Sequence, residues 1–106
     1  MRLDLPGGKR FGPGKAALLQ AISRHGSIRA AAESLSMSYP KALKLIEQMN
    51  ADFQVPLIES HHGGKTHGGS ELTDLGHEIL RQYDDICRAC ETSAQPMLKA
   101  IQTKLA

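Results

Sequence analysis

The chain has 106 residues, with 4% aromatic residues, no tryptophan and a formal net charge of +2. This length predicts one domain with a modest core built from Leu, Ile, Ala and Met. No apolar run is long enough to cross a bilayer, and the start lacks the apolar centre of a signal peptide, so we expect a cytoplasmic protein without a membrane partner.

The first twenty-five residues predict a short strand, a loop and a helix. Leu3 and Leu5 have strand spacing, and the glycines and prolines after them favour a loop. Lys9 and Arg10 in this loop are either phosphate contacts or solvated side chains. A helical pattern follows from about residue 13 and ends at Gly26. The face that we expect this helix to bury consists of Leu18, Leu19, Ile22 and His25.

Residues 26–50 predict two short amphipathic helices separated by a tight turn. Ser27 is placed to cap the first helix, and Ser38 followed by Tyr39 and Pro40 begins the second. The predicted buried positions are Ile28, Ala31, Ala32 and Leu35 in the first helix and Ala42, Leu45, Ile46, Met49 and Phe53 in the second. Small side chains at residues 30–32 allow the helices to cross closely, which is helix-turn-helix geometry.

The exposed face of the second helix is the first candidate for DNA contact. In a helix-turn-helix the second helix lies in the major groove with its first turns toward the bases. The candidate contacts from this pair of helices are Ser27, Arg29, Ser38, Tyr39, Pro40, Lys41, Leu43 and Lys44. A plain helical hairpin with a solvated outer face is the alternative.

A hairpin with a glycine-rich loop is predicted next, and it has the form of the wing of a winged helix. One strand spans residues 56–60, where Leu57 and Ile58 are expected on opposite faces, and Glu71 and Leu72 form the other. Glycines allow close approach to phosphates and a lysine supplies charge. The candidate DNA contacts in the loop are His62, Gly63, Gly64, Lys65, Thr66 and His67.

This loop has three other interpretations. It can be an uninvolved surface turn. A metal site formed by His61, His62 and His67 is disfavoured, because adjacent residues at a strand end point to opposite sides and no Cys or carboxylate has ligand spacing. The third is a nucleotide-binding phosphate loop, but the frame that such a loop requires is absent. We therefore predict no metal and no cofactor.

The last segment predicts a long helix capped by Thr73 and Asp74. Residues 71–106 carry four Lys and Arg against six Asp and Glu, or −2, whereas residues 1–70 carry nine against five, or +4. The apolar face of this long helix needs a partner to cover it, and a symmetric dimer supplies one. The candidate dimer contacts are Leu75, Ile79, Tyr83, Ile86, Cys87, Cys90, Met97 and Ile101. Pro96 predicts a break or kink near residue 95, followed by a further short helix.

Cys87 and Cys90 form a CxxC pattern within this helix. Positions three apart share one helix face, and no second ligand pair is present in the sequence. We predict reduced cysteines buried in the core. The alternative is a redox-sensitive cysteine pair at a dimer interface.

Three stretches carry a family resemblance: GSIRAAAESLSMSYPKALKLIEQMN, PLIES and GGKTHGGSELTDLGHEIL. Together they resemble the amino-terminal domain of the ModE molybdate-responsive regulators and, more distantly, the winged helix of LysR-type regulators. The similarity spans about residues 18–83, and its most specific part is Gly63-Gly64-Lys65, Gly68-Gly69, Leu72-Thr73 and Gly76. The resemblance implies a winged helix that binds DNA and dimerises through its terminal helices. Family members that sense molybdate use a separate carboxy-terminal domain, so no small-molecule effector domain is expected in this chain.

The combined prediction is a mainly α protein with a small β-hairpin: a winged helix-turn-helix over residues 1–72 and a dimerisation helix or helices over residues 73–106. We expect a homodimeric, sequence-specific regulator of transcription, not an enzyme, with double-stranded DNA as its partner. Two-fold symmetry predicts a palindromic site whose half-sites lie one or two turns apart, at roughly 34 Å per turn. The alternatives are a metal- or redox-responsive sensor and a winged helix that binds another protein.

Overall fold

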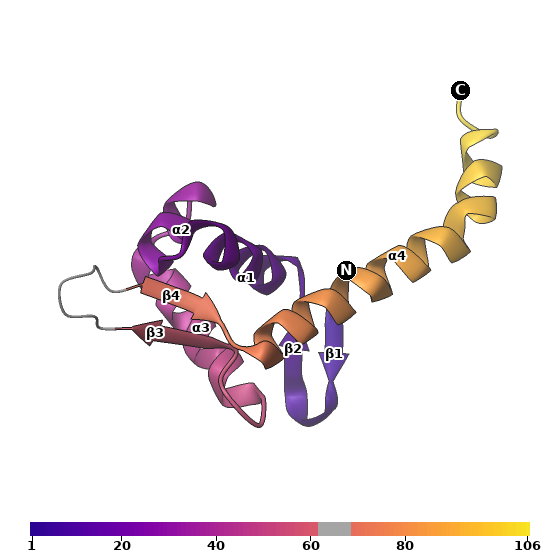
Figure 1. Ribbon diagram of the computed structural model, residues 1–106. Helices are drawn as coiled ribbons and strands as arrows, with labels where there is room; N and C mark the ends of the chain where they lie inside the picture. The colour runs from indigo at the N-terminus through magenta and orange to yellow at the C-terminus, as the bar shows by residue number, and fades with distance from the viewer. Residues whose placement is uncertain (62–68) are drawn as a thin grey trace.

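The computed structural model describes residues 1–61 and 69–106 and shows a small helical body from which one long helix projects (Figure 1). The principal extents of the molecule are 60 × 31 × 21 Å. The elements are, in chain order, β1 (Leu3–Leu5), a 3₁₀ turn (Pro6–Gly8), β2 (Lys9–Phe11), α1 (Pro13–His25), α2 (Ile28–Ser34), α3 (Tyr39–Asp52), β3 (Ile58–His61), β4 (Gly69–Leu72) and α4 (Asp74–Gln102). No helix among the described residues has both the length and the apolar character needed to span a membrane.

The amino-terminal segment forms a hairpin, where the sequence predicted one strand and a loop. Strands β1 and β2 pair antiparallel, with Leu3 opposite Phe11. Gly7 and Gly8 have φ of +79° and +74°, a region that glycine adopts without steric penalty. The glycines that predicted a loop therefore make a turn tight enough for the chain to reverse and pair with itself.

The core is formed by α1, α2 and α3 together with buried side chains of β2, β3, β4 and α4. Its largest fully buried side chains are Leu18, Leu19, Ile22, Met49 and Leu57. Burial of each such side chain contributes about 1.5–3 kcal/mol to folding. His25, predicted to share the buried face of α1, is exposed instead. The helix ends there because Gly26 adopts φ +74° and its N–H bonds the Ile22 carbonyl.

The predicted caps are present at the starts of three helices. Ser27 Oγ accepts a hydrogen bond from the Ala30 N–H at 3.0 Å, and Ser38 Oγ accepts one from the Lys41 N–H at 3.2 Å. Thr73 Oγ1 accepts from the Gly76 N–H at 3.1 Å. These bonds satisfy amide groups that the helices leave free and fix where each helix begins.

The second hairpin joins the helical body to α4. Strands β3 and β4 pair antiparallel, with Ile58 opposite Leu72. Leu57 and Ile58 are both buried, and β3 begins only at Ile58, later than the strand predicted from residue 56. The Ser70 N–H donates to the Gly26 carbonyl at 2.9 Å, so β4 is anchored to the end of α1.

Helix α4 is continuous, with Pro96 inside it. The predicted separate short helix does not form; instead the helix axis changes direction toward its yellow carboxy-terminal end (Figure 1). A proline removes one backbone hydrogen bond and displaces the preceding turn, which bends a helix without ending it when the later turns remain bonded.

Candidate nucleic-acid interface

The first turns of α3 present a polar, cationic surface. Tyr39, Pro40, Lys41 and Lys44 are exposed, whereas Leu43 is half-buried. This division follows from the helical period, because the opposite side of α3 buries Ala42, Ile46 and Met49 in the core. Leu45 and Phe53, also predicted for the buried stripe, are half-buried and pack at its edge.

The other predicted contacts of the two helices divide by role. Ser27 and Ser38 use their hydroxyl oxygens as caps, so they position the helices. Arg29 is exposed on α2, and its guanidinium carbon lies 4.7 Å from the centroid of the Tyr39 ring. The structure therefore brings Arg29 to the beginning of α3.

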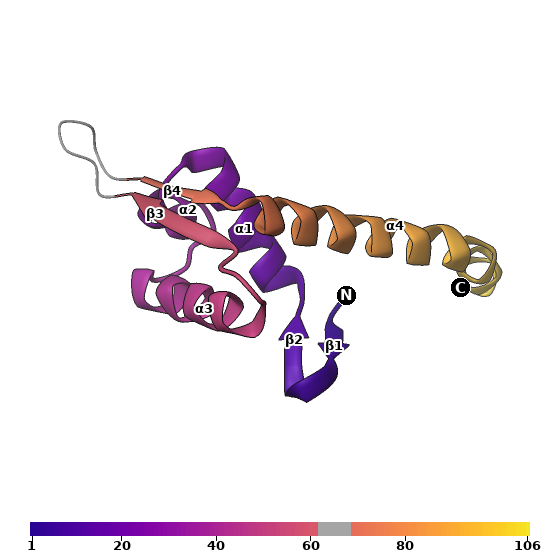
Figure 2. The same ribbon diagram turned by 60° about the horizontal axis from the view of Figure 1, so that its bottom comes forward.

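The end of the hairpin β3–β4 that adjoins the loop lies at the same end of the molecule as the first turns of α3 (Figures 1 and 2). His61 Nε2 lies 2.7 Å from Glu71 Oε1, and the hydroxyls of Ser60 and Ser70 are 3.0 Å apart. These pairs join the two strands where they approach the loop. The predicted loop contacts His62, Gly63, Gly64, Lys65, Thr66 and His67 fall outside the described residues.

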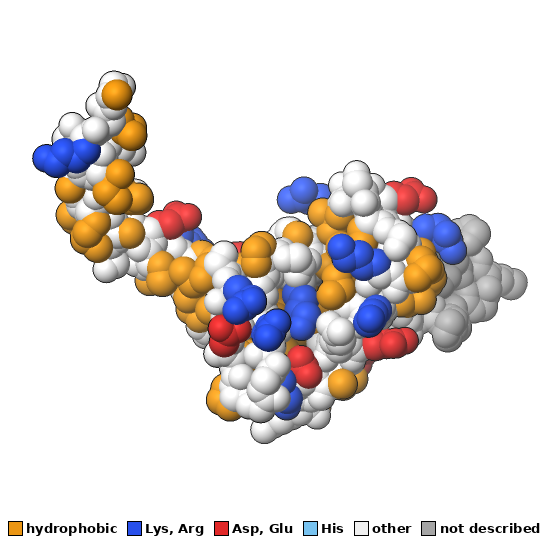
Figure 3. Space-filling view, turned by 180° about the vertical axis from the view of Figure 1, so that it is seen from behind, with side chains coloured by type: hydrophobic (Ala, Val, Ile, Leu, Met, Phe, Trp, Pro, Cys, Tyr) orange, Lys and Arg blue, Asp and Glu red, His pale blue; other side chains and the backbone are white. Residues whose placement is uncertain are grey.

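The amino-terminal hairpin sits at the other end of α3, where one lysine of the hairpin and one of α1 bond backbone carbonyls. Lys9 Nζ donates to the Asp52 carbonyl at 3.3 Å, and Lys15 Nζ donates to the Arg10 carbonyl at 2.7 Å. A lysine at the carboxy-terminal end of a helix also interacts favourably with the helix dipole. Figure 3 shows Lys and Arg side chains spread over one face of the body, with acidic side chains between them.

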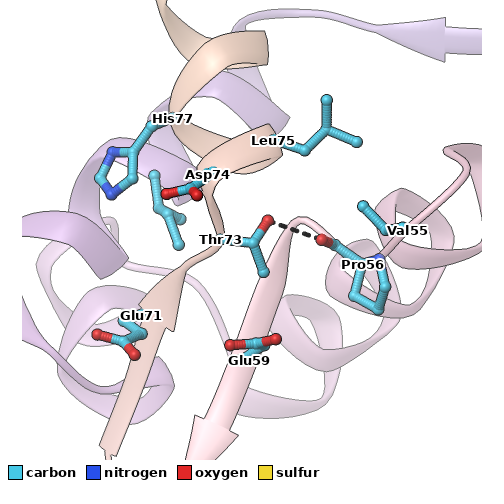
Figure 4. Close-up of a pocket in the computed structure, with 9 residues that line it drawn as sticks. Val55, Pro56, Glu59, Glu71, Thr73, Asp74, Leu75 and His77 are labelled. Carbon is cyan, nitrogen blue, oxygen red and sulfur yellow. Dashed lines mark hydrogen bonds between the residues drawn. The ribbon is translucent and has the colours of Figure 1, made fainter.

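An open groove of about 570 Å³ lies where β3, β4 and the start of α4 meet (Figure 4). Glu59 and Glu71 stand opposite one another in the strand register, and Asp74 and His77 also line the groove. Paired carboxylates repel a phosphate backbone, so this groove is unsuited to DNA. Within the groove, Thr73 Oγ1 donates a hydrogen bond of 2.7 Å to the Pro56 carbonyl and so joins the start of α4 to the segment before β3.

Two contacts that position this region were missed by the sequence reasoning, which named Gly76 only within the family motif. Asn50 Oδ1, near the end of α3, accepts from the Leu57 N–H at 2.9 Å and from the Ile58 N–H at 3.2 Å. A Cβ on Gly76 would lie 2.3 Å from the Leu57 carbonyl oxygen, so only glycine permits this approach of α4. An isolated glycine inside a helical pattern was the available signal for the second contact.

The outer part of α4 carries the exposed apolar side chains predicted for a dimer. Ile86, Met97 and Ile101 expose 38%, 57% and 61% of their surface. Leu75, Ile79 and Cys87 are half-buried against the core. Cys90 is exposed, so the prediction that both cysteines are buried is wrong.

Tyr83, predicted as a dimer contact, is instead buried in its own protomer. Its ring packs edge-on against Phe11 with centroids 5.3 Å apart, and its hydroxyl donates to the Met1 carbonyl. Burial raises the pKa of the Tyr83 hydroxyl, and the neighbouring Cys87 raises it further. The unpredicted strand β2 accounts for this placement, because it brings Phe11 against α4.

Among residues 1–61 and 69–106, no group of three His, Cys, Asp or Glu side chains is placed to hold a metal ion. The metal site considered for the wing loop included His62 and His67, which fall outside these residues.

Comparison with known families gives a match over residues 15–77 to the bacterial regulatory helix-turn-helix proteins of the lysR family. The chain belongs to this family. The match covers α1, the helix-turn-helix, the hairpin β3–β4 and the beginning of α4. It confirms the LysR-type helix-turn-helix predicted from the sequence.

Similar proteins include the molybdenum transport protein ModE of Azotobacter vinelandii, 36% identical over 105 residues, which are 99% of this chain and 37% of that protein. The transcriptional regulator ModE of Haemophilus influenzae is 38% identical over 79 residues, or 74% of this chain and 31% of that protein. The chain thus spans about a third of the length of these relatives.

Solved structures show the same fold. The CbnR_DBD–DNA complex matches with a TM-score of 0.63 at 27% identity, covering 83% of this chain and 95% of that one. CbnR itself, a LysR family transcriptional regulator, matches with a TM-score of 0.59 over 79% of this chain and 27% of its own.

Proposed function

We propose that this chain binds double-stranded DNA as a homodimer and regulates transcription. The helix α3 enters the major groove, and the loop between β3 and β4 contacts the adjacent backbone. The observation that carries this proposal is the exposed start of α3, where Tyr39, Lys41 and Lys44 lie beside Arg29. Membership of the lysR family supports it, as does the likeness to a solved protein–DNA complex.

The chain divides by role into residues 1–72, which bind DNA, and residues 73–106, which pair two copies. Support for the second part comes from the exposed apolar side chains Ile86, Met97 and Ile101, at spacings that keep them on one side of α4. Two copies related by a two-fold axis would present two α3 helices to a palindromic site, with half-sites one or two turns apart.

A direct test removes single lysines. The duplex is one selected from a random library by the wild-type protein, and affinity is measured by fluorescence anisotropy. Lys44→Ala is expected to weaken binding and to lower the steepness of the salt dependence by about 0.9 for each phosphate that is no longer neutralised. Lys104→Ala removes the same charge beyond the end of α4 and is expected to leave affinity unchanged. Equal losses of affinity in the two variants would contradict the assigned face.

The pairing of two copies is tested by Ile101→Lys, which places a charge on the exposed apolar side of α4. Sedimentation is expected to show a monomer with unchanged helix content, because Ile101 has 61% of its surface exposed in the protomer. Gln102→Lys adds the same charge at the neighbouring exposed position and serves as the control. A dimer that persists in Ile101→Lys would exclude this part of α4 from the interface.

A further inference from the structure

Arg29 and Tyr39 form a contact that bridges the two helices of the helix-turn-helix. Arg29 belongs to the first turn of α2, and Tyr39 is the first residue of α3. The guanidinium carbon lies 4.7 Å from the ring centroid, well within the range of a cation–π interaction. Both side chains remain exposed, so the pair lies on the surface that the proposed function assigns to DNA.

The backbone beneath this pair is held on both sides. The Ser27 cap fixes the start of α2, and the Ser38 cap fixes the start of α3. Pro40 adds a fixed φ directly after Tyr39. The remaining freedom of Tyr39 is rotation of its side chain, and the guanidinium over its ring restricts that rotation.

We propose that Arg29 is a positioning residue for Tyr39, and that Tyr39 discriminates between DNA sequences. This inference rests on the proposed function, because it concerns how the same surface reads a duplex. An exposed side chain that is ordered only on binding loses rotamer freedom at that moment, whereas a ring already held in place loses less. Arginine suits the role because its planar group lies flat on a ring and keeps its N–H edges free.

The alternative role for Arg29 is an independent contact to a phosphate, and the two roles differ in additivity. If Arg29 acts through Tyr39, its removal matters only while the tyrosine ring is present. If it acts alone, its removal has the same effect in every background. An independent phosphate contact also weakens binding to all sequences alike, since phosphates carry no sequence information.

The test is a double-mutant cycle of Arg29→Ala and Tyr39→Ala. Affinity is measured for the duplex selected by the wild-type protein and for a shuffled duplex of equal length. We expect Arg29→Ala to weaken binding of the selected duplex about two- to five-fold more per half-site in the wild-type background than in Tyr39→Ala. Binding to the shuffled duplex is expected to change little, so discrimination between the two duplexes falls.

Three control variants separate positioning from charge and folding. Tyr39→Phe keeps the ring and is expected to keep the coupling. Arg29→Lys keeps the charge and is expected to lose part of the discrimination without a change in salt dependence. Arg81→Ala removes an exposed arginine from α4 and is expected to leave discrimination intact. Thermal unfolding of each variant reports any structural role, which would lower stability without changing the ratio of the two affinities.

Independent effects of Arg29→Ala and Tyr39→Ala would overturn the inference, as would equal weakening on both duplexes with a salt slope reduced by about 0.9 per phosphate. Either result would leave the proposed function standing. A wild-type protein that binds no duplex would instead overturn the proposed function.

Discussion

Gly76 is the position where one added methyl group is expected to change the whole arrangement of the hairpin and α4. Its Cβ would lie 2.3 Å from the Leu57 carbonyl oxygen, against 3.4 Å or more for ordinary contact. The first turn of α4 must therefore move by about 1 Å in Gly76→Ala, since the obstacle is backbone. That movement strains the hydrogen bond of 2.9 Å from the Thr73 N–H to the same Leu57 oxygen.

Three contributions set the expected change in the free energy of unfolding of Gly76→Ala. Overpacking of a close contact destabilises by about 1–3 kcal/mol, and weakening of a hydrogen bond adds about 1 kcal/mol. The higher helix propensity of alanine opposes these two effects and stabilises the folded state by about 1 kcal/mol. The free energy of unfolding is thus expected to fall by about 1–3 kcal/mol, which lowers the midpoint of thermal unfolding by about 5–20 °C for a domain of this size.

The assay is thermal and urea unfolding of Gly76→Ala followed by circular dichroism, with Gly14→Ala as the matched control. Gly14 also lies inside a helix, but nothing lies within 4 Å of a Cβ added there. Gly14→Ala is therefore expected to be as stable as the wild type or more so. If Gly76→Ala and Gly14→Ala have the same unfolding midpoint, the claim is refuted that close approach, and not chain flexibility, requires glycine at position 76.

Three further outcomes are expected. Asn50→Ala should lower the free energy of unfolding by about 1–3 kcal/mol, because the Leu57 and Ile58 N–H groups lose their acceptor; Gln48→Ala, an exposed change on the same helix, is the control in urea unfolding. Ser36 has φ +53°, so a β-branched residue there is strained, and Ser36→Val should destabilise by about 1–2 kcal/mol while Ser36→Gly should not. The raised pKa of Tyr83 means that its contribution to stability is present below pH 10 and is lost as the pH rises through the folded-state value. In Tyr83→Phe the midpoint of thermal unfolding should fall less steeply between pH 8 and 11 than in the wild type. An equally steep fall in the variant would show that Tyr83 is not the group responsible.

The parts of the fold that sequence reasoning found are those specified locally. Ser27, Ser38 and Thr73 cap helices through bonds to residues three positions later, so each start could be predicted from a short window. The helical period likewise separated the buried side of α3 from its exposed side. The predicted contacts of α2 and α3 are consequently exposed, apart from the half-buried Ser27 and Leu43.

The parts that it missed depend on contacts between segments far apart in the chain. Strand β2 exists because Phe11 pairs opposite Leu3 and packs on Tyr83. An apolar stripe on α4 shows which residues avoid water but not whether the same chain or a second copy covers them. Tyr83 was therefore assigned to a partner when its own amino terminus covers it. Asn50 was missed for the same reason, since its polar partners belong to another element.

Contact of duplex DNA with the beginning of α3 and the hairpin beside it is the central claim. Amide hydrogen exchange of the full chain, with and without the selected duplex, tests it residue by residue. We predict new protection over residues 38–44, with none over β1 and β2 at the opposite end of α3. Protection confined to the amino-terminal hairpin or to the groove between Glu59 and Glu71, with α3 unchanged, would contradict it.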